Sequence, residues 1–153
     1  MGLYPWREWS RTEKSYFLQI VPIATAVFSV LFAGRLRTLY ADPSLWGRAS
    51  IVLITYLLWG FYQELVYRGI LQTELVRRWG SLPGILVSNS LYTFGPLHFY
   101  HLSTASPLPM FVAIFAIGLF FAVLFRRSGN LWIVGVFHGI GDCYFTALAT
   151  IGH

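Results

Sequence analysis

One uncharged stretch decides the fold of this chain. Residues 79–125 read WGSLPGILVSNSLYTFGPLHFYHLSTASPLPMFVAIFAIGLFFAVLF and contain no Asp, Glu, Lys or Arg. A helix that spans a bilayer needs about 20 apolar residues, so this stretch is long enough for two spans. A break between positions 98 and 109 is predicted by His98, His101, Ser103, Thr104, Ser106, Pro107 and Pro109. We therefore expect one span at about 83–99 and another at about 108–125.

The composition of the whole chain is that of a membrane protein. Hydrophobic residues make up 56% of the 153 residues and charged residues 11%, whereas a soluble domain averages roughly 45–50% and about 25%. Apolar runs outside the uncharged stretch predict three more spans, at about 15–34, 49–78 and 131–148. Backbone polar groups in lipid must be paired within helices. The expected fold is therefore all-α, a polytopic helical membrane protein with about five transmembrane helices around a polar cavity.

The predicted organisation is a single membrane domain, residues 1–153, with no soluble domain attached. Residues 1–48 are expected to form an N-terminal segment with one added span, and residues 49–150 the core. The net charge is +5, but the basic residues lie between apolar blocks, where they set topology and contact anionic lipid. We expect membrane lipid as a partner and no nucleic acid.

Polar residues inside the predicted spans are candidates for chemistry, because an ionisable side chain costs about 2.5–3.5 kcal/mol to insert there. Three of the expected spans carry such residues, and we expect them to converge on the polar cavity. They are Gln63, Glu64 and Arg68 in the second span, His98 in the third, and His138 and Asp142 in the fifth.

The spacing within these sets adds information. Glu64 and Arg68 are four residues apart, which on an α-helix predicts an ion pair and a supporting role for the arginine. His138 and Asp142 have the same spacing, and an aspartate beside a histidine fixes the tautomer and orientation of the ring. Asn89, in the third span, is expected either to pack helices together or to reach the cavity.

Four kinds of function stay open from the residues alone. A carboxylate beside a histidine can take a proton from water while a second histidine and its partner stabilise an oxyanion, which is peptide hydrolysis. His98, His138 and a carboxylate could instead hold zinc. The same groups suit a proton relay in a transporter, and they also suit plain hydrogen bonding between helices.

The three polar sets resemble the motifs of a known family. Residues 63–69, QELVYRG, resemble the Glu-Glu-x-x-x-Arg motif of the CPBP family, also called the ABI or CaaX-protease family. Residues 94–98, FGPLH, resemble its Phe-x-x-x-His motif, and residues 138–142, HGIGD, its His-x-x-x-Asn/Asp motif. With the approach RSGNLW at 127–132, the resemblance covers about residues 49–150.

Members of that family are intramembrane endopeptidases. The resemblance implies that position 63 and His98 activate water, while His138 and position 142 stabilise the oxyanion. No cofactor is expected, and zinc at His98 and His138 is the less favoured alternative. The predicted catalytic positions are Gln63, Glu64, His98, His138 and Asp142, with Arg68, Phe94 and Asn89 in support.

The resemblance also implies a class of substrate, the C-terminal tail or peptide of a membrane-associated protein. Family members trim prenylated CaaX proteins, process bacteriocins or cut C-terminal sorting tails. The small size of this chain favours the sorting-tail, myxosortase-like branch. We therefore expect an integral, multi-pass protein of a bacterial or archaeal inner (cytoplasmic) membrane.

One position departs from the family pattern. Gln63 stands where the family has the glutamate that acts as general base, and a neutral amide cannot accept the proton. Three explanations are open: an engineered Glu→Gln substitution, a natural binding-only relative, or a takeover by Glu64. We favour the first because the amide is isosteric, and then this chain is inactive as given. The alternative functions are a non-catalytic membrane binding protein of the same fold and a proton-coupled transporter.

Overall fold

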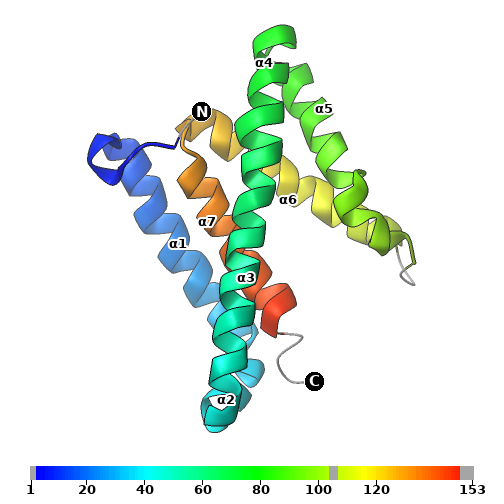
Figure 1. Ribbon diagram of the computed structural model, residues 1–153. Helices are drawn as coiled ribbons and strands as arrows, with labels where there is room; N and C mark the ends of the chain where they lie inside the picture. Colours follow the sequence, from blue (N-terminus) through cyan, green and yellow to red (C-terminus); the bar gives the residue numbers. More distant parts are fainter. Residues whose placement is uncertain (1–2, 104–106, 149–153) are drawn as a thin grey trace. The chain divides into compact units, whose positions relative to one another are not determined.

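The computed structural model describes residues 3–103 and 107–148, and within these ranges every regular element is a helix (Figure 1). The all-α prediction is therefore confirmed. The chain divides into two compact units, of which unit 1 comprises residues 1–3 and 65–131 and unit 2 comprises residues 4–64 and 132–153. The predicted single domain stays a prediction.

Three helical stretches are long and apolar enough to cross a membrane. They are Arg11–Leu31, Pro43–Trp79 and Pro107–Ser128. Large apolar side chains on them face outward, with Val30 77% exposed and Leu108 72% exposed. Such surfaces are unfavourable in water and are the normal surface of a helix in lipid. The chain is thus a helical membrane protein.

Two of the five predicted spans are shorter helices in the structure. Helix α5 (Ser81–Thr93) has 13 residues and α7 (Leu131–Asp142) has 12. At 1.5 Å per residue they are about 20 and 18 Å long, less than the roughly 30 Å of a hydrocarbon core. Helix α5 is followed by the 3₁₀ helix Pro96–Ser103 and α7 by the π-helical segment Cys143–Ala147. The number of five crossings stays a prediction.

Unit 2 contains α1 (Arg11–Leu31), α2 (Ala33–Ala41), α3 (Trp46–Glu64) and all of α7 except its first residue, Leu131. A hydroxyl and a carboxylate set the start of α1. Glu13 N donates to Ser10 Oγ (3.2 Å), and Ser10 N donates to Glu13 Oε2 (2.7 Å), which is a capping box. Helix α1 therefore begins at Arg11, before the predicted start at 15. The Ser-x-x-Glu pattern that explains this start is visible in the sequence.

Helices α3 and α7 approach each other closely in unit 2, at positions occupied by glycine. A Cβ atom added to Gly60 would lie 2.7 Å from Gly139 Cα, and one added to Gly139 would lie 2.5 Å from the Leu57 carbonyl oxygen. A Cβ atom at Gly135 would lie 2.4 Å from the Phe61 ring. Small residues spaced four apart let helix backbones come together, and Gly135 and Gly139 have this spacing on α7.

Unit 1 contains the π-helical segment Leu65–Gln72, α4 (Thr73–Trp79), α5 and α6 (Pro107–Ser128). Helices α4 and α5 form a hairpin and lie side by side in green in Figure 1. Gly80 turns the chain with a φ of +84°, a conformation that favours glycine. A Cβ atom at Gly84 would lie 2.6 Å from Val76 N, so the hairpin closes tightly.

Candidate active site

The first motif lies where α3 ends at Glu64 and the chain continues as the π-helical segment Leu65–Gln72. A π-helix bonds residue i to residue i+5, one residue further along than an α-helix. The predicted ion pair between Glu64 and Arg68 stays a prediction. In the structure Glu64 contacts His138 in unit 2, and Arg68 contacts residues of unit 1.

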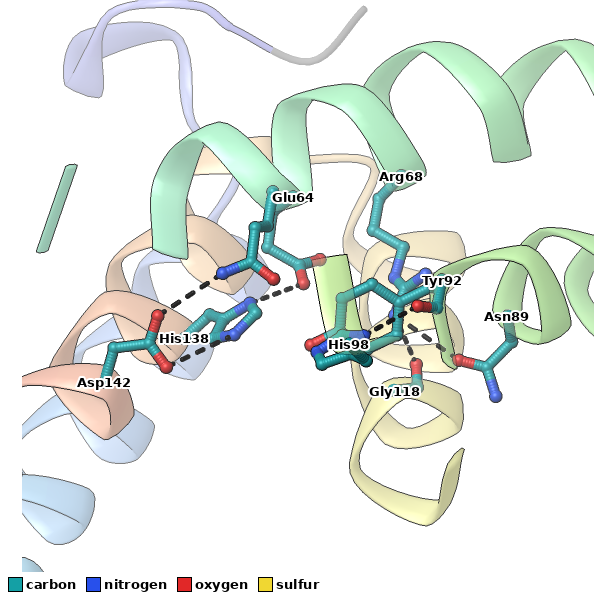
Figure 2. A network of polar contacts seen from close by, with 9 residues as sticks. Glu64, Arg68, Asn89, Tyr92, His98, Gly118, His138 and Asp142 are labelled. Atoms are coloured by element: carbon teal, nitrogen blue, oxygen red, sulfur yellow. Dashed lines mark hydrogen bonds and ion pairs between the residues drawn. The ribbon is translucent and has the colours of Figure 1, made fainter. Parts of the chain in front are cut away.

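Glu64 and His138 form the shortest contact of the candidate site in unit 2. Glu64 Oε1 lies 2.8 Å from His138 Nδ1, and the two side chains are 0% and 9% exposed. A carboxylate accepts, so the proton of this bond is on Nδ1, and Nε2 is the nitrogen that points toward Asp142 (Figure 2). No spacing along the chain indicates this contact, because it joins α3 to α7.

Asp142 lies between an imidazole and an amide. Its Oδ1 is 3.7 Å from His138 Nε2, as the four-residue spacing on α7 predicts, and its side chain is 22% exposed. Gln63 Nε2 donates to Asp142 Oδ2 at 3.5 Å, the long limit of a hydrogen bond. In unit 2 these contacts therefore join four residues in a continuous set, Glu64–His138–Asp142–Gln63. Of the two carboxylates in this set, that of Asp142 is the more exposed.

The glycine contact between α3 and α7 explains why these side chains meet. Gly60 lies one turn before Gln63 and Glu64 on α3, and Gly139 lies directly after His138 on α7. With the two backbones in contact at these glycines, the polar side chains near them on each helix are brought within hydrogen-bonding distance.

Arg68 is the centre of a buried polar cluster in unit 1. The residue is 0% exposed, and its Nη2 donates to the Gly118 carbonyl at 2.9 Å and to Asn89 Oδ1 at 3.4 Å. Its guanidinium carbon lies 4.6 Å from the centre of the Tyr92 ring, a cation–π distance. Asn89 Nδ2 donates to the Phe115 carbonyl at 2.9 Å. Arg68 and Asn89 thus tie α5 and the π-helical segment to α6.

His98 lies near the start of the 3₁₀ helix and contacts the last turn of α5. Helix α5 ends at Thr93 and the 3₁₀ helix begins at Pro96, before the break predicted between positions 98 and 109. His98 is buried, and its Nδ1 lies 2.8 Å from the Tyr92 carbonyl oxygen. A carbonyl only accepts, so in this bond Nδ1 carries the proton and Nε2 keeps its lone pair. Phe94 contacts Phe111, with ring centres 5.5 Å apart.

Two residues of unit 1 were not predicted from the sequence. Tyr92 packs against both Arg68 and His98, and Gln72 Nε2 donates to the Ala122 carbonyl at 2.9 Å. Gln72 is 1% exposed. The signal that could have indicated it is an amide inside the span predicted at about 49–78. Tyr92 had no such signal, because its carbonyl and its ring, not its hydroxyl, make these contacts.

The structure thus assembles Gln63, Glu64, His138 and Asp142 in unit 2, and Arg68, Asn89, Phe94 and His98 in unit 1. The predicted convergence of all of them on one cavity stays a prediction. Among residues 3–103 and 107–148, no three His, Cys, Asp or Glu side chains are grouped so that they could hold a metal ion. The cofactor prediction likewise stays a prediction.

Arg68 gives a test of the cluster in unit 1. Arg68→Met removes the donor to the Gly118 carbonyl and to Asn89 Oδ1, and buried acceptors without a donor cost roughly 1–3 kcal/mol each. We expect a clear loss of thermal stability in detergent, measured by unfolding of the purified protein. The matched control is Arg37→Met on the exposed face of α2. Equal unfolding temperatures for the two variants would contradict a structural role for Arg68.

Comparison with known proteins bears on this site directly. The chain matches the profile of a family described as type II CAAX prenyl endopeptidase Rce1-like, over residues 45–144. This range contains all three motifs and agrees with the core predicted at 49–150. No curated protein and no solved structure matches the chain at a significant level. Because the family profile covers well over half of its length, the chain belongs to the Rce1-like family of membrane proteases.

Proposed function

We propose that this protein is an intramembrane endopeptidase that cuts a peptide bond near the C-terminus of a membrane-associated protein by activating water. The observation that carries the proposal is the set Glu64–His138–Asp142, two carboxylates on the two nitrogens of one imidazole. Family membership supports a protease, and the three long apolar helices support a site that membrane-bound substrates can reach.

The chemistry needs a proton acceptor for water and donors for the oxyanion. Unit 2 supplies carboxylates in contact with His138 and the amide of Gln63. Unit 1 supplies His98, whose ring is oriented by the contact of its Nδ1 with the Tyr92 carbonyl. The proposal that His98 joins the reaction is supported by its match to the second family motif.

The substrate is proposed to be a short C-terminal tail that follows a lipid anchor or a transmembrane helix. A chain whose long helices expose apolar surface meets its substrate within the bilayer plane. Within this class, a bacterial or archaeal sorting tail is our preferred substrate, and a prenylated CaaX tail is the alternative.

Reconstituted protein tests the proposal. Proteoliposomes are mixed with three peptides: a farnesylated CaaX peptide, the same peptide without the prenyl group, and a transmembrane helix with a C-terminal sorting tail. We expect at least one to be cut at a single bond by this chain or by its Gln63→Glu variant, detected by mass spectrometry, and His138→Ala to abolish the product. The matched control is His101→Ala, which lies in the 3₁₀ helix outside the set Glu64–His138–Asp142.

The contrary outcomes are equally specific. Absence of cleavage by this chain and by its Gln63→Glu variant would contradict the proposed protease. Tight binding of a tail without cleavage by either protein would support a non-catalytic relative, and pH-dependent flux across the membrane would support a transporter.

A further inference from the structure

The identity of the proton acceptor is open because Gln63 has no carboxylate. The chain has six acidic residues. Four of them lie outside the polar sets: Glu8 and Glu13 at the N-terminus, Asp42 in the turn before α3, and Glu74 in α4, where it pairs with Arg77 and Arg78. The water-activating carboxylate must therefore belong to Glu64 or Asp142.

Burial separates these two carboxylates. The side chain of Glu64 is 0% exposed and its Oε1 is engaged by His138 Nδ1 at 2.8 Å. A water molecule and a peptide carbonyl cannot both reach such a group. The side chain of Asp142 is 22% exposed, and its two oxygens face His138 Nε2 and Gln63 Nε2. Asp142 is therefore the carboxylate that a substrate can approach.

We infer that Asp142 is the general base of this chain, and that Gln63 supplies the amide beside it. The inference rests on the proposed protease function. The pair has its amide on α3 and its acid on α7, 3.5 Å apart, and a double variant can exchange the two. Glu64 is then a positioning residue that acts through His138.

The imidazole completes the arrangement. Glu64 fixes the proton on Nδ1, so the lone pair of Nε2 points at Asp142 Oδ1, 3.7 Å away. Two lone pairs facing each other are unfavourable, and a proton that Asp142 takes from water removes the repulsion. The pair can therefore accept a proton from water at one step and return it at the next.

The reaction balances with water alone. The pair Asp142–His138 takes one proton from a water molecule while the water oxygen bonds to the scissile carbonyl carbon. The carbonyl oxygen becomes an oxyanion, and the second N–H of Gln63 is free to donate to it. The C–N bond then breaks, and the stored proton moves to the leaving nitrogen. The products are one carboxyl group and one amine.

A four-member cycle at positions 63 and 142 tests the exchange. The proteins are the chain itself, Gln63→Glu, Asp142→Asn and the double variant Gln63→Glu/Asp142→Asn, each in proteoliposomes with whichever peptide of the panel is cut. We expect Asp142→Asn to lower kcat/KM by about 10²-fold or more, the range of general base catalysis. The double variant again has one acid and one amide, and we expect it to recover at least about tenfold of that loss.

A pH profile separates chemistry from structure. The acidic limb of kcat/KM belongs to the proton acceptor, so it should differ between the chain and the double variant, whose acceptor is a glutamate on α3. Asp42→Asn is the matched control, since it makes the same chemical change in an exposed turn, and its profile should equal that of the chain. If Asp142→Asn does not fold, Asp142→Glu and Asp142→Gln replace it as a pair of equal size, and only the glutamate should be active.

The results that overturn the inference differ from those that overturn the function. Activity of Asp142→Asn within tenfold of the chain overturns the inference, and so does a double variant no better than Asp142→Asn. Cleavage by both proteins that carry Gln63→Glu, with none by the chain, places the base at 63 and leaves the protease function standing. No cleavage by any member with any peptide removes the protease function itself.

Discussion

A Glu64→Gln variant is expected to fold normally and to lose about 10²- to 10⁴-fold in kcat. The carboxylate of Glu64 fixes the proton of His138 on Nδ1. An amide at this position can donate its own N–H to Nδ1, which moves the ring proton to Nε2 and removes the lone pair that faces Asp142. The loss should appear in kcat, with KM little changed, because Glu64 is fully buried and does not touch the substrate.

The matched control for Glu64→Gln is Glu8→Gln, the same change at an exposed site near the N-terminus. Steady-state cleavage in proteoliposomes measures both variants, and their unfolding temperatures show whether a fold defect contributes. Full kcat in Glu64→Gln would contradict the positioning role of this residue. A loss of stability as large as the loss of activity would mean that Glu64 only holds α3 to α7.

Gly139→Ala is expected to destabilise unit 2 and to remove most of the activity. The added Cβ atom would lie 2.5 Å from the Leu57 carbonyl oxygen, which is backbone and cannot turn aside. Helices α3 and α7 must then separate, and overpacking of this kind costs typically about 1–3 kcal/mol. The separation also pulls His138 away from Glu64, so activity should fall more steeply than stability alone predicts.

Gly141→Ala is the control on the same helix. A Cβ atom there meets nothing within 4 Å, and Ala favours a helix by up to about 1 kcal/mol over Gly. We therefore expect Gly141→Ala to be neutral or stabilising in thermal unfolding. Equal effects of the two substitutions would contradict the close contact between α3 and α7.

The membrane character of the chain was predictable because it depends on composition alone. The uncharged stretch 79–125 and the exposed apolar side chains have the same cause, because lipid solvates the surface of a membrane helix. Helix ends were less predictable. The capping box of Ser10 and Glu13 starts α1 at Arg11, before the predicted start at 15. Helix α5 ends at Thr93, within the predicted span 83–99, and a 3₁₀ helix follows it to Ser103.

The candidate residues were predictable one by one, and their partners were not. Spacing along one α-helix indicated the contact of His138 with Asp142, because both residues lie on α7. It could not indicate the contact of Glu64 with His138, because these two residues lie on different helices. The contacts of Arg68 and Gln72 with the Gly118 and Ala122 carbonyls had no sequence signal at all, since every residue carries a carbonyl.

The π-helical segment Leu65–Gln72 also constrains how this chain can vary. A π-turn holds more residues than an α-turn, so the segment stores extra length. Deleting one residue would allow ordinary α-helical winding and would change the directions of side chains within the segment by up to about 100°. Arg68 and Gln72 would then miss the two carbonyls of α6, which lie four residues apart. Insertions and deletions among natural relatives should therefore avoid residues 65–72 and collect in the connecting turns.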